Sequence, residues 1–167
     1  MRAMGDKALA KERMLAAGVP TAPAYFGADQ SAERLTREAQ RIGYPLLIKA
    51  TAGGGGRGIR VLTDPRELLP AIESARREAQ SAFGDGTIML EKRIEHGRHV
   101  EVQVFADSHG NAVYLGDRDC SAQRRRQKLI EEAPAPGLSD ALRQRMGESA
   151  VQAALSIGYT GAGTVEF

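Results

Sequence analysis

Apolar residues recur every three or four positions in several segments of the chain, and this period predicts helices. The predicted helices occupy residues 6–17, 31–42, 64–83 and 139–157. Gly43 and Gly84 follow the second and third of them, where a left-handed glycine commonly ends a helix. The residues expected to face the interior are Leu35, Ala39 and Ile42 of the second helix, Leu68, Ile72, Ala75, Ala79 and Phe83 of the third, and Leu142, Met146, Ala150, Ala153 and Ile157 of the last.

Short apolar or alternating segments between these helices predict strands. They lie at residues 21–26, 45–50, 58–62, 87–90, 99–105, 112–115 and 163–167. Within the segment 99–105, the side chains of Val100, Val102 and Val104 fall on one face of the strand. A turn at residues 108–111 then leads into the hairpin partner of this strand.

A glycine-rich loop is the most unusual feature of the sequence. Glycine makes up 19 of the 167 residues, and five of them stand within six positions, at Gly53, Gly54, Gly55, Gly56 and Gly58. Such a run costs backbone entropy, but its bare N–H groups can fold over phosphate oxygens. Because the loop joins two predicted strands and lacks the lysine and helix of a P-loop, we expect a flap over phosphate. A flexible hairpin tip is the structural alternative.

Charged residues stand where two apolar strands end. Lys49 stands at the end of the apolar strand before the glycine loop, on the strand face opposite Ile48, where its ammonium group can reach phosphate. Glu91, Lys92 and Ile94 follow the apolar strand 87–90, where backbone groups and a carboxylate can bind the edge of an adenine ring. A solvated surface lysine and a solvated charged turn are the respective alternatives.

A basic stretch runs from Arg118 to Lys128 and is densest from Gln123 onward. If this part is one strand, its cations share a face, and such a row predicts an anion site for phosphate or bicarbonate. The cations in question are Arg124, Arg126 and Lys128, while Gln123, Arg125 and Gln127 share the other face. RNA binding is the alternative, which the near absence of aromatic residues and the acidic flanks disfavour.

Glu166 lies at the end of a predicted apolar strand, where we expect its carboxylate to be buried. A buried carboxylate is usually paired or bound to a metal ion, and Mg²⁺ prefers carboxylate oxygen, so Glu166 is a candidate Mg²⁺ ligand. The spacing of His96, His99 and His109 predicts no metal site.

Composition excludes several function classes. A net charge of +2 is small for a nucleic-acid-binding protein, and no apolar run approaches the ~20 residues that span a bilayer. The first residues lack the apolar core of a secretory signal. The single cysteine excludes an intramolecular disulfide and a cysteine-based zinc site. We therefore expect a cytosolic protein that binds neither nucleic acid nor membrane.

Several short motifs identify a family when they are taken together. They are Met4-Gly5-Asp6-Lys7, Ile48-Lys49-Ala50, the loop Gly53–Gly58, Arg98-His99-Val100-Glu101, Arg118-Asp119-Cys120-Ser121, Gln127-Lys128 and Glu131-Glu132-Ala133-Pro134. In order and spacing they resemble the biotin carboxylase component of biotin-dependent carboxylases of the acyl-CoA and pyruvate type, which are ATP-grasp enzymes. The resemblance covers essentially the whole chain, and residues 118–136 carry its most specific part.

The resemblance implies an α+β chain with the ATP-grasp fold. Residues 1–20 would form a leading helix, 21–93 the lid subdomain with the glycine flap, and 94–167 the first part of an antiparallel catalytic lobe. The family's N-terminal Rossmann-like domain, second metal carboxylate and general base would then lie outside this chain. We therefore expect a fragment that binds nucleotide weakly and does not turn over.

The resemblance also implies roles for individual residues. The ATP phosphates would be bound by Lys7, Lys49 and the glycines Gly53, Gly54, Gly55, Gly56 and Gly58, and adenine would be held by Glu91, Lys92 and Ile94. His99 would lie near ribose and Gln123 near the phosphates. Lys128 would hold bicarbonate as the catalytic residue, and Glu166 would bind Mg²⁺. The position of Arg126 commonly carries histidine in the family, so no role is assigned to Arg126.

The reaction implied by the resemblance is the carboxylation of biotin with MgATP and bicarbonate through carboxyphosphate. Mn²⁺ could replace Mg²⁺, and the biotin would be carried on a carrier domain. The implied partners are that biotin carboxyl carrier domain and a carboxyltransferase. The parent enzyme of this family is often a homodimer. A eukaryotic source would place the enzyme in the mitochondrial matrix. Two alternatives remain: another ATP-grasp ligase of the carbamoyl-phosphate synthetase type, which residues 123–136 disfavour, and a nucleotide-binding module without catalysis.

Overall fold

The computed structural model describes residues 7–52, 59–125 and 127–167. These residues form two compact units. The first unit contains the chain up to Glu12 together with Thr21–Glu95, and the second contains Arg13–Pro20 together with His96–Phe167. The glycine loop, with Gly53, Gly54, Gly55, Gly56 and Gly58, and the basic residue Arg126 lie outside the described residues.

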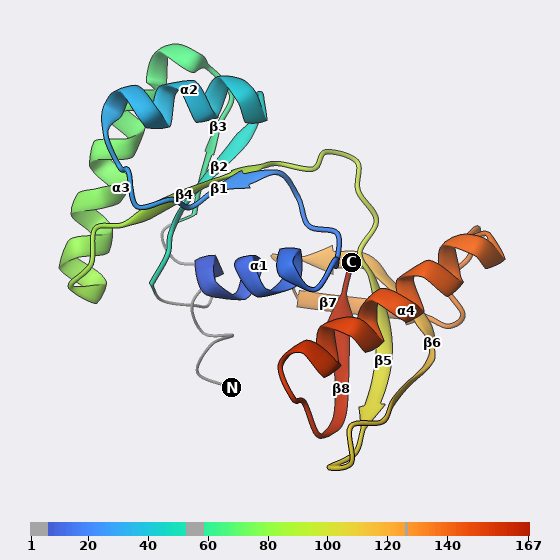
Figure 1. The fold of residues 1–167 in the computed structure, drawn as a ribbon. Helices are drawn as coiled ribbons and strands as arrows, with labels where there is room; N and C mark the ends of the chain where they lie inside the picture. Colours follow the sequence, from blue (N-terminus) through green and yellow to red (C-terminus); the bar gives the residue numbers. More distant parts are fainter. Residues whose placement is uncertain (1–6, 53–58, 126) are drawn as a thin grey trace. The chain divides into compact units, whose positions relative to one another are not determined.

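The first unit is built on an antiparallel sheet with the order β1-β4-β2-β3 in the described part of the chain (Figure 1). Its strands are β1 (Ala24–Tyr25), β2 (Leu46–Ala50), β3 (Arg60–Leu62) and β4 (Ile88–Lys92). Helices α2 (Ala32–Ile42) and α3 (Leu68–Phe83) pack on this sheet. The shared core contains Leu35, Ala39 and Ile42 from α2, Leu68, Ile72 and Ala75 from α3, and Leu46, Ile48, Ile88 and Leu90 from the strands.

Local signals fix the ends of these helices as the sequence predicts. The Ser31 hydroxyl accepts a hydrogen bond from the Arg34 N–H at 3.2 Å and caps α2. Gly84 ends α3 with a φ of 72°, a left-handed conformation that suits glycine. The structure differs in the first turn of the predicted third helix, where Pro65–Glu67 form a separate 3₁₀ turn, η2, capped by the Asp64 carboxylate.

The second unit contains an antiparallel sheet with the order β7-β6-β5-β8 among its described residues. The strands are β5 (Val100–Ala106), β6 (Ala112–Arg124), β7 (Gln127–Glu132) and β8 (Gly161–Glu166). Helix α4 (Asp140–Ser156) packs against β5 and β6, as Figure 1 shows. Its buried residues Met146, Ala150 and Ala154 share a core with the valine face of β5, which confirms the predicted alternation of that strand.

Three expectations about burial and strand length are wrong. Phe83 and Leu142 continue the apolar stripes of their helices, but they stand near the helix ends, outside the part of each stripe that is buried. Both side chains are exposed. The predicted strand 112–115 is the beginning of a strand that continues to Arg124. The basic stretch is therefore not one strand but the end of β6 and the start of β7, which pair as a hairpin with Gln123 opposite Lys128.

We predict that Ile48→Ala lowers the free energy of unfolding by about 2–5 kcal/mol, because Ile48 is fully buried between the sheet and its helices. Val61→Ala is the matched control, since Val61 lies half-exposed on the neighbouring strand β3, and it should cost about 1 kcal/mol or less. Denaturant unfolding followed by circular dichroism measures both. Equal losses would contradict the assignment of the core.

Candidate functional site

Sheet register brings Glu91 and Lys49 together in the first unit. Glu91 of β4 lies opposite Leu47 of β2, so its side chain shares the face of Leu47 and Lys49, two residues further along. This face is turned away from the apolar core, because alternation along β2 buries Leu46 and Ile48 on the other side. Strand geometry alone therefore sets a glutamate beside a lysine.

Glu91 is held by two lysines. The Lys49 ammonium donates to Glu91 Oε1, and the Lys11 ammonium, from helix α1 (Lys7–Ala16), donates to Oε2 at 2.8 Å. The side chains of Glu91 and Lys49 are each 17% exposed, and that of Lys11 only 9%. Burial favours protonation, but the hydrogen bonds from Lys11 and Lys49 outweigh it and lower the pKa of Glu91. The group is thus a partly buried cation–anion–cation cluster.

The remaining predicted residues of this unit lie at different places. Lys7 Nζ donates to the carbonyl of Ala50, at the end of β2 and beside the glycine loop in sequence, at 3.3 Å. Lys92 Nζ donates to the carbonyls of Gly43 and Tyr44, at 3.3 and 2.7 Å. Glu91 and Lys92 belong to β4 itself rather than to the linker after it, which corrects the predicted strand end. Ile94 follows β4 and is 63% exposed.

A second charged cluster follows the register of the other sheet. Glu101 of β5 lies directly opposite Arg118 of β6 and, on its other side, Glu166 of β8. These side chains share the face opposite to the valines that pack on α4. The β6–β7 hairpin adds Lys128 from the outer strand and Gln123 opposite it. One acidic residue in the middle of the sheet therefore has charged neighbours on both flanking strands.

Glu101 is the most deeply buried group of this cluster, with 5% of its side chain exposed. Arg118 donates to it through Nε at 2.7 Å, and Lys128 donates to its other oxygen. Burial raises the pKa of Glu101, but the hydrogen bonds from Lys128 and Arg118 prevail and lower it. Conversely, hydrogen bonds to Glu101 and Glu166 raise the pKa of Lys128, so its ammonium stays charged.

His99 and Glu166 complete the second cluster. Lys128 Nζ donates to Glu166 Oε1 at 2.8 Å, and His99 Nε2 lies 3.4 Å from the same oxygen. On the other side of the ring, His99 Nδ1 lies 2.5 Å from the amide nitrogen Nε2 of Gln123. The structure thus brings His99, Gln123, Lys128 and Glu166, four of the predicted site residues, into one group in the second unit.

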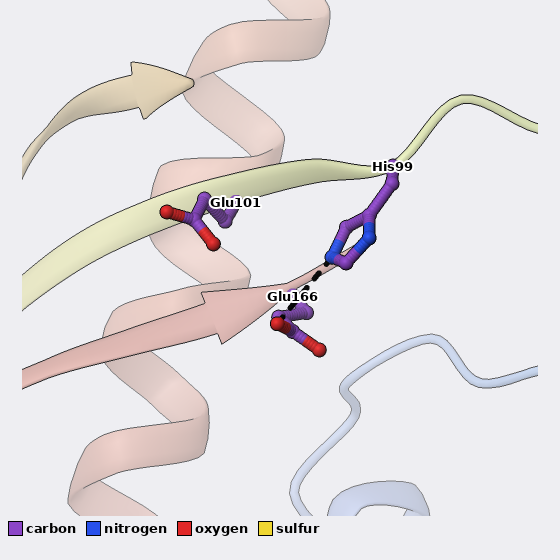
Figure 2. A group of neighbouring side chains, drawn as sticks. All are labelled: His99, Glu101 and Glu166. Carbon is purple, nitrogen blue, oxygen red and sulfur yellow. Dashed lines mark ion pairs between the residues drawn. The ribbon is translucent and has the colours of Figure 1, made fainter. Parts of the chain in front are cut away.

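Side-chain donors of His99, Glu101 and Glu166 lie within 4.8 Å of one another and could hold a metal ion (Figure 2). The donor set fits Mg²⁺ through its two carboxylates, whereas the imidazole nitrogen is a less suitable ligand for this hard cation. The expected burial of Glu166 is wrong, because its side chain is 57% exposed. Its strand β8 carries small residues and lies at the edge of the described sheet.

Sequence reasoning gave no role to Lys11, Glu101 or Arg118, although all three are central to the charged clusters. Glu101 had a local signal, since it is the one charged residue among the alternating valines of β5. Lys11 had none, because its partner Glu91 lies 80 residues away in sequence. Among the described residues, no helix is long and apolar enough to cross a membrane.

Comparison with protein families and curated proteins shows one consistent likeness. Residues 6–167 match the family model described as "Carbamoyl-phosphate synthase L chain, ATP binding domain". Over all 167 residues the chain is 57% identical to the mitochondrial methylcrotonoyl-CoA carboxylase subunit alpha of Dictyostelium discoideum and 55% identical to the chloroplastic biotin carboxylase 1 of Populus trichocarpa. It spans 24% and 32% of the length of these two relatives.

Solved structures point the same way. A biotin carboxylase of Campylobacter jejuni in complex with β,γ-ATP matches 98% of this chain with a TM-score of 0.86 and 53% identity. The biotin carboxylase domain of the Hydrogenobacter thermophilus 2-oxoglutarate carboxylase, in complex with MgADP, ADP and bicarbonate, matches 99% with a TM-score of 0.86 and 51% identity. The chain covers 36% and 37% of these two solved chains. The α+β class and the ATP-grasp fold are thereby confirmed.

We predict that Glu101→Gln destabilises the chain at pH 7 and that the loss shrinks as the pH falls. The lowered pKa of Glu101 means that its stabilisation is complete above the unfolded value of roughly 4.3 and is lost as the pH falls through the folded value. Denaturant midpoints at pH 7, 5 and 3 measure the difference. Glu132→Gln, exposed on strand β7 of the same sheet, is the control. A loss that is independent of pH would contradict the prediction.

Proposed function

Since the chain belongs to the family of the carbamoyl-phosphate synthase L chain ATP-binding domain and is homologous to biotin carboxylases, we propose that it binds the ATP and bicarbonate of a biotin carboxylation reaction. The observation that carries this proposal is the pairing of both candidate ligand-binding lysines with glutamates: Lys49 with the partly buried Glu91, and Lys128 with the buried Glu101. Such pairing fixes an ammonium group in position, which suits an anionic ligand.

In the first unit, Lys49, Lys7 and the glycine loop would bind the ATP phosphates. Lys49 is already oriented by Glu91, and Lys7 lies at the Ala50 carbonyl, where β2 ends. Their positive charge reduces the repulsion that an anionic nucleophile meets when it approaches a polyphosphate. Glu91, Lys92 and Ile94 would bind adenine, in keeping with their positions at and beyond the end of β4.

In the second unit, Lys128 would hold bicarbonate, while His99 and Gln123 would contact the nucleotide. A bicarbonate oxygen attacks the γ-phosphorus, the bond from that phosphorus to the β–γ bridging oxygen breaks, and ADP leaves. The resulting carboxyphosphate releases carbon dioxide and phosphate. The ureido nitrogen of biotin gives its proton to the released phosphate and forms a bond to the carbon of carbon dioxide. The lasting positive charge of Lys128 orients bicarbonate and stabilises the negative charge that develops in these steps.

Glu166 would be a Mg²⁺ ligand through its carboxylate, with Glu101 as the second carboxylate of the same group. Mg²⁺, or Mn²⁺ in its place, supplies charge neutralisation at phosphate oxygens. The exposed position of Glu166 leaves room for water and phosphate ligands, which Mg²⁺ generally retains in nucleotide sites.

Partners follow from the same proposal. The biotin would be presented by a biotin carboxyl carrier domain and the carboxyl group passed to a carboxyltransferase, in a homodimeric parent located in the cytoplasm or in the mitochondrial matrix. The names of the relatives support the carboxylase assembly, and they include mitochondrial and chloroplastic proteins. They disfavour a carbamoyl-phosphate synthetase activity, because relatives more than half identical to this chain are biotin-dependent carboxylases.

We predict that Lys49→Ala weakens MgATP binding about tenfold or more, because a phosphate-binding charge is lost. Isothermal titration calorimetry of the 167-residue chain measures the affinity, and Arg41→Ala, which removes an exposed cation of α2, is the control. We expect weak binding by the unmodified chain and no bicarbonate-dependent ATP hydrolysis in the presence of free biotin. Unchanged affinity of the Lys49 variant would remove this lysine from the phosphate site, and biotin-dependent turnover would contradict the expected inactivity.

We predict that Glu166→Gln raises the Mg²⁺ concentration needed for half-maximal ATP binding several-fold, since a neutral amide is a poorer Mg²⁺ ligand than a carboxylate. ATP titrations at a series of Mg²⁺ concentrations test this, with metal-free ATP binding as the internal reference. Glu148→Gln on the exposed face of α4 is the control. An unchanged Mg²⁺ dependence would exclude Glu166 as a ligand.

A further inference from the structure

Glu91 has two lysine partners, yet only Lys49 has a proposed role toward the nucleotide. Lys11 is the more deeply buried of the two, with 9% of its side chain exposed. Taking a lysine out of water costs free energy that its ion pair with Glu91 must offset. Lys11 also follows Lys7 by four positions on α1, so both side chains lie on the same helix face. That face turns Lys7 toward the end of β2 and Lys11 toward β4.

Phosphate binding by Lys49 poses an electrostatic problem that Lys11 can solve. In the structure the Lys49 ammonium donates to Glu91 Oε1. When this ammonium turns to a phosphate oxygen, Glu91 loses one of its two cations while it remains mostly buried. A buried carboxylate without a counter-ion is costly, and that cost would be subtracted from the nucleotide affinity. Because Lys11 bonds the other carboxylate oxygen, Glu91 keeps a cation throughout.

We propose that Lys11 is a positioning residue that holds and neutralises Glu91 so that Lys49 is available to the phosphates of the bound nucleotide. This inference rests on the proposed function, since it assumes that Lys49 binds phosphate. Lys11 acts through Glu91 and does not itself contact the ligand. Without Lys11, Glu91 has Lys49 as its remaining lysine partner among the described residues, and the carboxylate competes with phosphate for that ammonium.

A purely structural role of Lys11 makes a different prediction. If Lys11 only attaches α1 to the sheet, its loss lowers stability, and removing the charge of Glu91 as well cannot restore nucleotide binding. If Lys11 neutralises Glu91, removing that charge makes Lys11 dispensable. Glu91→Gln keeps an oxygen acceptor and the shape of the side chain but removes the negative charge. The two roles are therefore separated by one double variant.

The test compares the MgATP affinities of Lys11→Met, Lys11→Arg and the double variant Lys11→Met/Glu91→Gln in the 167-residue chain by calorimetry. We expect about a tenfold loss for Lys11→Met, most of it recovered in Lys11→Arg and in the double variant. Lys11→Met should also cost little affinity in a Lys49→Ala background, because the competition is then gone. Arg60→Met, which removes the partly exposed partner of Glu78, is the control and should bind normally. Thermal unfolding of each variant shows that the folded fraction is the same at the temperature of the titration.

Unchanged affinity of Lys11→Met would overturn the inference. So would a loss that the Glu91→Gln change fails to restore, or a loss of equal size with and without Lys49, since either result shows a structural role. Absence of MgATP binding by the unmodified chain would instead refute the proposed function, and the role of Lys11 with it. Binding by the unmodified chain that is lost in Lys49→Ala but unaffected in Lys11→Met refutes the role of Lys11 alone.

Discussion

A glutamate that a β-sheet holds largely out of water needs cations as partners, and both charged clusters of this protein depend on that constraint. Glu91 and Glu101 each stand on a strand whose opposite face packs into an apolar core. The core fixes the strand, so neither carboxylate can turn freely into water, and each needs hydrogen-bonding partners within the fold. Each has two cations, and in both cases the hydrogen bonds from these cations outweigh burial and lower the pKa of the carboxyl group.

Strand register supplies most of these partners without any special loop. Lys49 reaches Glu91 from a diagonal position on the adjacent strand, and Arg118 stands directly opposite Glu101. The hairpin that pairs β6 with β7 brings in Lys128 from one strand further out. Since backbone ladders hold these positions, the ammonium groups are oriented before any ligand arrives, which is the condition for strong electrostatic binding of anions.

The sequence predicts the helices and most strands, because each leaves a local mark such as a period or a cap. It fails where the outcome depends on which segments meet. The run from Gln123 to Lys128 is uniformly polar, so no period reveals that it turns between two strands. Glu166 ends an apolar segment but lies on a strand at the edge of the described sheet, which leaves its side chain exposed. The bond from Lys11 to Glu91 spans 80 positions, so no local pattern in the sequence reveals it.

The two clusters share one further property that bears on the cost of binding an anion. In each, one cation has a proposed ligand, Lys49 or Lys128, and the other, Lys11 or Arg118, has none. Arg118 approaches Glu101 Oε1 through two nitrogens, at 2.7 and 2.6 Å, and so fixes the carboxylate independently of Lys128. An ammonium group that leaves such a carboxylate for a phosphate or bicarbonate oxygen exchanges one anion for another. The carboxylate keeps its second cation, no buried charge is left unpaired, and the free energy of the new ion pair is not spent on desolvation.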